Sequence, residues 1–178
     1  MHINILGTMR TREFKSWFSS GEFDAGNVVV VVSTSYADDV ASIRSEASNR
    51  GLAGNVLVLE YDDVENLKRP TAITAEMASA AVSFLRGASS EGTSFLMVCD
   101  GGFSRSAAMC AAWARISGEN DVDFWIQPEK YSPNLLVYRR MLAAAGINLK
   151  DDQIERLGEL KEAMRMLRIK AGGKSASN

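Results

Sequence analysis

One segment of the chain brings together residue types that can bind an anion and attack it. It reads Cys99-Asp100-Gly101-Gly102-Phe103-Ser104-Arg105-Ser106. A guanidinium carries a planar fork of donors that matches two oxygens of a phosphate group, and a cysteine thiolate is a strong nucleophile. The spacing therefore predicts a phosphate-binding loop in which Cys99 attacks phosphorus, Arg105 holds the oxygens, and residues 100–105 surround the anion.

The residues on either side of this loop predict a strand before it and a helix after it. Ser94–Cys99 is a short apolar run that ends at the cysteine, and Ser104–Ser117 has a helical composition. The first N–H groups of a helix have no partner within the helix, and the helix dipole is positive at that end. A loop that meets such an end forms a ring of donors around an anion. Gly101 and Gly102 suit that ring because glycine accepts positive φ values.

The same helix end is expected to ionise Cys99. Helix N-termini and neighbouring guanidinium groups stabilise a thiolate relative to a thiol. Cys99 is therefore expected to be a thiolate at neutral pH without help from a histidine. Ser106 is expected to hydrogen-bond the cysteine sulfur and so make it a better leaving group.

The remaining apolar runs predict an α/β fold, because runs rich in Val, Leu and Ile that alternate with helices are typical of a buried parallel sheet. The expected strands are Ile3–Leu6, Val28–Ser33, Val56–Tyr61 and Ser94–Cys99. The expected helices are Arg12–Ser19, Ala37–Asn49, Thr74–Arg86, Ser104–Ser117, Asn134–Ala145 and Asp151–Ile169. We expect one domain over residues 1–169, with a mainly parallel central sheet of about four strands flanked by helices, and a helical C-terminal part. Residues 170–178 are expected to form a flexible tail.

The composition excludes several kinds of catalytic site. The chain has 178 residues, a formal net charge of −2 and a single histidine, His2. A Ser-His-Asp triad, a Cys-His pair and a two-histidine metal site each require a histidine within the fold. The two cysteines, Cys99 and Cys110, do not suggest a disulfide framework and cannot form a four-ligand zinc site by themselves. We therefore expect neither a metal nor a cofactor, and we expect Cys110 to pack in the core.

Charge and hydropathy also limit the expected partners and location. No run of Lys or Arg is long enough to predict nucleic-acid binding. The longest apolar run, Val28–Val32, is far too short to cross a bilayer, and the N-terminal residues lack the features of a signal peptide. We expect a cytoplasmic protein, in a compartment that keeps thiols reduced, with no nucleic-acid or membrane partner.

The loop resembles a known family signature. Cys99-x5-Arg105-Ser106 matches the Cys-x5-Arg-Ser/Thr signature of the protein tyrosine phosphatase superfamily and looks most like the dual-specificity branch, including its small bacterial and phage-type members. Further segments resemble that branch's strand-to-acid loop, its helix before the signature strand and a helix start in its bacterial members: Leu59–Val64, Ala81–Leu85 and Ser132-Pro133-Asn134. Together these matches cover roughly residues 55–145.

The resemblance implies a hydrolase that works through a phosphocysteine intermediate. In this family an aspartate, a few tens of residues before the cysteine, protonates the leaving oxygen and later activates water. Asp63 and Asp62 both fit that interval. We favour Asp63, because it lies further beyond the strand Val56–Tyr61, and keep Asp62 as the alternative acid. The implied partner is a phosphorylated substrate, either a protein phosphotyrosine or phosphoserine or a small phosphomonoester.

Three positions depart from the family pattern, and other functions therefore stay open. Val98 stands where the family usually has histidine, Asp100 adds a carboxylate to an anion-binding loop, and Gly101 stands where alanine is common. The absence of that histidine gives some weight to an alternative function, a phosphate-binding pseudophosphatase module with little or no turnover. Arsenate reductases, low-molecular-weight tyrosine phosphatases and rhodanese-like sulfurtransferases use related loops. The position of this loop in the middle of the chain disfavours the first two, and its Arg-Ser ending disfavours the third.

Overall fold

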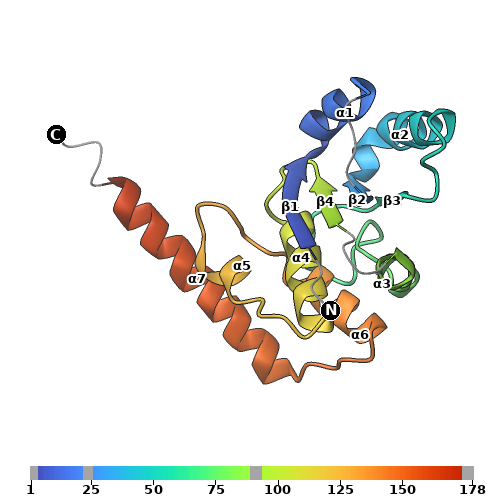
Figure 1. The fold of residues 1–178 in the computed structure, drawn as a ribbon. Helices are drawn as coiled ribbons and strands as arrows, with labels where there is room; N and C mark the ends of the chain where they lie inside the picture. The colour runs from blue at the N-terminus through green and yellow to red at the C-terminus, as the bar shows by residue number, and fades with distance from the viewer. Residues whose placement is uncertain (1–3, 22–25, 89–93, 174–178) are drawn as a thin grey trace.

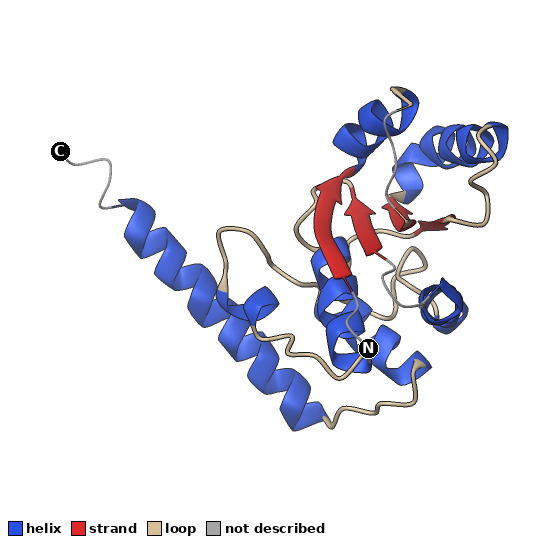
Figure 2. Ribbon diagram, in the orientation of Figure 1, coloured by secondary structure: helices blue, strands red, loops and turns tan. Residues whose placement is uncertain are grey.

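The computed structural model describes residues 4–21, 26–88 and 94–173, with the backbone alone for residues 4–6 and 171–173. Its strands are β1 (Asn4–Arg10), β2 (Asn27–Val32), β3 (Val56–Glu60) and β4 (Ser94–Cys99). Its helices are α1 (Thr11–Ser19), η1 (Thr34–Tyr36), α2 (Ala37–Asn49), α3 (Ala75–Ala88), α4 (Arg105–Ile116), α5 (Asp123–Ile126), α6 (Leu135–Ala144) and α7 (Asp151–Gly173). Figures 1 and 2 show the strands together at the centre of the α/β domain, with helices around them.

The strands form one parallel sheet in the order β1-β4-β2-β3. In this order β4 lies between β1 and β2, where Cys99 pairs with Arg10 on one side and with Val31 on the other. All the strands point the same way, so the residues that follow them meet at one edge of the sheet. Ligands of open α/β sheets bind at this carboxyl edge.

Helices cover both faces of the sheet, and β2 shows why. Its valines are completely buried, and successive residues of a strand point to opposite faces. Val29 and Val31 pack in the layer formed with α3, α4 and α6. Val28 and Val30 pack in the layer formed with α1 and α2. Burial of each such side chain contributes about 1.5–3 kcal/mol, so the run of valines anchors both layers to the sheet.

The predicted elements are present, with corrections to β1, to α7 and for the short helices η1 and α5. β1 runs on to Arg10 instead of ending at Leu6, because Gly7 takes a φ of +116° and the pairing register shifts there instead of breaking. The predicted first residue of that strand, Ile3, lies outside the described residues. The short helix α5 was not predicted. α7 continues to Gly173, so residues 170–173 extend the helix rather than begin a tail. Residues 174–178 lie outside the described part of the chain.

The long helix α7 extends away from the rest of the domain at its C-terminal end (Figure 1). Its outer half carries exposed apolar side chains, including Leu167 and Ile169. Within the described ranges, no helix combines the length and apolar character that crossing a bilayer requires.

Candidate active site

The loop between β4 and α4 is a tight turn built on Gly102. The N–H of Gly102 donates to the carbonyl of Cys99 over 3.1 Å, and Gly102 has a φ of +69°. A Cβ at this position would lie 3.0 Å from the backbone nitrogen of Arg10 and 3.0 Å from the backbone carbon of Met9. Glycine is therefore required here twice, for its conformation and for the close approach of the loop to β1.

Gly101 is a glycine for a different reason from the one that we expected. It is not among the described glycines with a positive φ. A Cβ at Gly101 would instead lie 2.5 Å from the ring of Phe103. That ring is about half exposed, at 49%, and lies at the rim of the loop. Gly101 thus leaves room for the aromatic side chain that shapes the rim.

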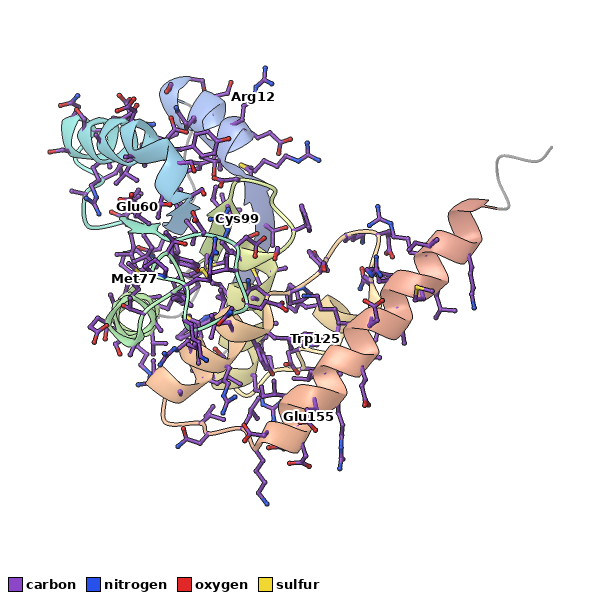
Figure 3. The ribbon with its side chains drawn as sticks, turned by 180° about the vertical axis from the view of Figure 1, so that it is seen from behind. Arg12, Glu60, Met77, Cys99, Trp125 and Glu155 are labelled. Atoms are coloured by element: carbon purple, nitrogen blue, oxygen red, sulfur yellow. The ribbon has the colours of Figure 1, made fainter. Side chains whose placement is uncertain are left out.

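Cys99 and Ser106 lie together beneath this turn. The Sγ of Cys99 is 3.1 Å from the Oγ of Ser106, and both residues are buried. The expected contact is therefore present. Figure 3 places Cys99 in the centre of the molecule, between the layer of α1 and α2 and the helices on the other side of the sheet. Val98 points into the α1–α2 layer while Cys99 packs in the opposite one, so Val98 takes no part in the thiol's surroundings.

Arg105 is a buried cation, and one of its three side-chain nitrogens has no hydrogen-bond partner among the described residues. Its side chain is 4% exposed. Its Nη1 donates to the carbonyl of Tyr61 over 2.6 Å, and its Nη2 donates to Oδ2 of Asp100 over 2.7 Å. Its Nε is buried and has no hydrogen-bond partner among the described residues. A buried donor without a partner is costly, and a bound oxyanion would satisfy it.

Neighbouring negative groups stabilise the protonated form of Arg105. Burial lowers the pKa of the guanidinium, but the hydrogen bond and negative charge of Asp100, with the charges of Cys99 and Asp63, raise it overall. Arg105 therefore stays cationic at neutral pH.

Asp63 accepts two hydrogen bonds, one from the loop and one from the start of α6. Its Oδ1 accepts from Oγ of Ser104 over 2.8 Å and from Nδ2 of Asn134 over 2.7 Å. Asn134 is buried and caps α6, where its Oδ1 accepts from the N–H of Val137 over 3.0 Å. One rigid side chain therefore links the start of α6 to a carboxylate at the mouth of the loop. Asp63 itself is exposed, as a proton donor to a substrate must be.

Asp62, the adjacent carboxylate, faces a different part of the sheet edge. Its Oδ1 accepts from Oγ of Ser33 over 2.6 Å and from the N–H and Oγ1 of Thr34 over 3.0 and 2.9 Å. The hydrogen bond from Ser33 is the main cause that lowers the pKa of Asp62 from 3.8 to about 2. The structure thus brings Asp63, and not Asp62, to the loop.

Sequence reasoning missed three groups of this site. The Oγ1 of Thr11 lies 3.4 Å from Oδ1 of Asp100, the carbonyl of Tyr61 accepts from Arg105, and Asn134 holds Asp63. For Asn134 the sequence carried a signal, the helix start Ser132-Pro133-Asn134, but not its partner. The other two contacts follow from the placement of β1 and β3 beside the loop.

Two cavities flank the loop. One, of about 420 Å³, is lined by Gly101, Gly102 and Phe103 on the loop and by residues of β1 and the segment before α6. The other, of about 400 Å³, is lined by Thr11, Arg12, Lys15, Tyr36, Asp39 and Asp100. Both cavities adjoin the loop, and neither is lined by Cys99, Arg105 or Asp63.

The rest of the described chain offers no further centre of this kind. Cys110 is buried on α4, where its Sγ is 3.6 Å from the carbonyl of Gly7. Burial raises the pKa of its thiol strongly, which is the behaviour of a packing residue. Among the described residues, no cluster of three His, Cys, Asp or Glu side chains is placed to hold a metal ion.

Comparison with known proteins finds similarity to solved structures. No protein-family model matches the chain, and no curated protein does. The chain is similar to a solved structure described as "Crystal structure of Tk-PTP in the active form", with 21% identity and a TM-score of 0.45 over 91% of this chain and 92% of that one. At this identity the similarity concerns the path of the chain and carries no information about activity.

Proposed function

We propose that this protein is a cysteine-dependent phosphomonoester hydrolase of the protein tyrosine phosphatase type, close to the dual-specificity branch. The observation that carries the proposal is the buried guanidinium of Arg105. It lies at the N-terminus of α4, six positions after a buried cysteine, and its Nε has no hydrogen-bond partner in the described part of the chain. A preorganised cation with a free donor at a helix N-terminus suits a phosphate group.

In the first step of the proposed reaction, the thiolate of Cys99 attacks phosphorus. An S–P bond forms while the bond from phosphorus to the leaving oxygen breaks. Asp63, held at the mouth of the loop by Ser104 and Asn134, gives its proton to that oxygen. Arg105 and the loop amides bind the three remaining oxygens and stabilise the charge of the transition state.

In the second step, water attacks the phosphocysteine. Asp63, now a carboxylate, takes a proton from the water, the S–P bond breaks, and its electrons return to the sulfur of Cys99. Ser106, whose Oγ is 3.1 Å from Sγ, donates a hydrogen bond to the departing thiolate and so lowers the barrier. Inorganic phosphate then leaves, and Asp63 is protonated for the next cycle.

We infer that the substrate is a protein phosphotyrosine or phosphoserine, or a small phosphomonoester. Both cysteines are free, and the nucleophile must stay reduced to work. A reducing cytoplasm is therefore the proposed location. No metal is needed in this scheme, because Arg105 and the loop amides carry the positive potential.

A second candidate is a phosphate-binding module with little or no turnover. The observation in its favour is the ion pair between Arg105 and Asp100, which places a negative charge within the loop that must accept an anion. Such a module would use Arg105 and the amides without needing Asp63 as an acid.

The test is the hydrolysis of p-nitrophenyl phosphate against pH, with a chelator present, by wild type and by the variants Cys99→Ser, Asp63→Asn and Asp62→Asn. We expect no turnover by Cys99→Ser. We expect Asp63→Asn to turn over slowly and to lose the fall in rate at high pH, because that fall reports deprotonation of the acid. Asp62→Asn, the matched control, should keep both rate and profile. If wild type shows no turnover while phosphate still protects Cys99 from alkylation, the phosphate-binding module is the correct reading.

A further inference from the structure

The proposed phosphate-binding loop carries a negatively charged side chain of its own. Asp100 is the residue that follows Cys99, and its Oδ2 lies 2.7 Å from Nη2 of Arg105. Its side chain is 28% exposed, against 4% for Arg105. Its other oxygen, Oδ1, is 3.4 Å from Oγ1 of Thr11. Among the described residues, Arg105 is the cation with which Asp100 forms an ion pair, so the two charges neutralise each other when the loop holds no ligand.

This pairing matters because the same guanidinium must bind the phosphate. A phosphate group in the loop would lie against Nε and Nη2 of Arg105, within a few ångströms of the Asp100 carboxylate. Like charges at that separation repel strongly in a partly buried site, where solvent screens them poorly. Phosphate therefore binds at the cost of weakening an existing ion pair.

We propose that Asp100 is an internal counter-ion that sets the affinity of the loop for phosphate and speeds the release of the phosphate product. The proposal rests on the proposed function, since it assumes that the loop binds phosphate. The amide of Asp100 still belongs to the ring of donors, while its carboxylate competes with the ligand for Nη2 of Arg105. The loop is thereby kept from retaining inorganic phosphate, which is both product and inhibitor.

Asp100 is not needed to hold Arg105 in place. The guanidinium is buried, and its Nη1 donates to the backbone carbonyl of Tyr61 over 2.6 Å. This carbonyl follows β3 directly and cannot move without disturbing the sheet edge. Removal of the charge at Asp100 therefore weakens its competition with the ligand for Nη2 without releasing the side chain of Arg105.

The decisive variant is Asp100→Asn, which keeps the shape of the side chain and an oxygen that can accept from Nη2, but removes the charge. Its matched control is Asp39→Asn. Asp39 lines the same 400 Å³ cavity as Asp100 and pairs with Lys15 instead of Arg105. Both variants remove one negative charge from the lining of the same cavity. A difference in phosphate affinity between them therefore reports the contact of Asp100 with Arg105.

The measurement is the protection of Cys99 from iodoacetamide by inorganic phosphate, followed by mass spectrometry of the peptide that contains Cys99. The phosphate concentration that halves the alkylation rate gives the affinity without requiring turnover. We expect it to fall about tenfold in Asp100→Asn and to stay unchanged in Asp39→Asn. For a hydrolysed substrate, KM should fall in Asp100→Asn while kcat does not rise, because product release becomes slower.

Several outcomes would overturn the proposal. Unchanged or weaker phosphate binding by Asp100→Asn means that Asp100 positions Arg105 instead of competing with the ligand. An equal increase in phosphate affinity in Asp39→Asn means that only the overall charge around the cavity matters. Absence of phosphate binding by wild type refutes the anion site and the proposed function with it. Asp100→Ser replaces Asp100→Asn if the latter shows no cooperative thermal unfolding.

Discussion

Replacement of Gly102 by alanine probes the architecture on which the candidate site depends. Gly102 has a φ of +69°, in the left-handed region. This conformation costs an L-residue about 1–2 kcal/mol. The added methyl group would also lie 3.0 Å from backbone atoms of Met9 and Arg10. Those atoms belong to β1, which pairs with β4 up to the level of Cys99, so they cannot retreat without disturbing the sheet.

The expected cost is the sum of these two effects. Overpacking against a backbone that cannot move adds about 1–3 kcal/mol. We therefore expect Gly102→Ala to lower the free energy of unfolding by roughly 2–5 kcal/mol. Phosphate should also protect Cys99 less well, because the amides of a displaced loop no longer converge on the anion.

Gly118→Ala separates the two effects. Gly118 has a φ of +81°, and a Cβ there meets no atom within 4 Å. It follows α4 at the end remote from the loop, so the variant carries the conformational cost alone, about 1–2 kcal/mol. Urea denaturation with linear extrapolation measures both variants. If Gly102→Ala is no less stable than Gly118→Ala, the loop does not press against β1 and our description of the turn is wrong.

Two further predictions concern the carboxylates and their partners. Hydrogen bonds lower the pKa of Asp62 from 3.8 to about 2 in the folded state, so this residue stabilises the protein above about pH 4 and the contribution disappears as the pH falls toward 2. Between about pH 4 and pH 2, Asp62→Asn should reduce the change in the free energy of unfolding by about 1 kcal/mol, after an allowance for solvent screening. An unchanged pH dependence would contradict the lowered pKa of Asp62. Asn134→Ala removes the cap of α6 and should cost about 1 kcal/mol in urea denaturation. It also frees Asp63, so kcat should fall for substrates with poor leaving groups much more than for p-nitrophenyl phosphate; an equal loss for both would indicate a purely structural role for Asn134.

Much of the site could be predicted because its signals are local. The spacing of Cys99, Arg105 and Ser106 lies within one turn and the start of one helix, and local geometry fixes their relative positions. The buried strands were equally clear, since a run such as Val28–Val32 is apolar at every position, as a strand covered on both faces requires. The preference for Asp63 over Asp62 came from counting residues beyond the end of a strand. Asp63 is the one of the two whose hydrogen bond to Ser104 brings it to the loop, and its role as the acid stays a prediction.

The remainder depends on contacts between distant segments. The hydrogen bond from Asn134 to Asp63 joins residues 71 positions apart, and no local pattern specifies it. The pairing of β1 with β4 places Thr11 beside Asp100, although 89 positions separate them. Asp100 and Arg105 are close in sequence, but their ion pair depends on which way the side chain of Asp100 turns. The contact of the loop with β1 fixes the shape of the loop. The first strand was predicted to end at Leu6, but β1 continues through Gly7 to Arg10. In a sequence, a glycine inside a strand cannot be told from a glycine that follows its end.

Detection of phosphocysteine at Cys99 tests the central claim most directly. Asp63→Asn is mixed with p-nitrophenyl phosphate, whose leaving group departs without a proton, and the reaction is stopped in acid for mass spectrometry of the Cys99 peptide. We predict that this variant accumulates a phosphoryl group on Cys99, because the second step lacks its base. Hydrolysis by wild type with no phosphoryl group on Cys99 in either protein would contradict the mechanism.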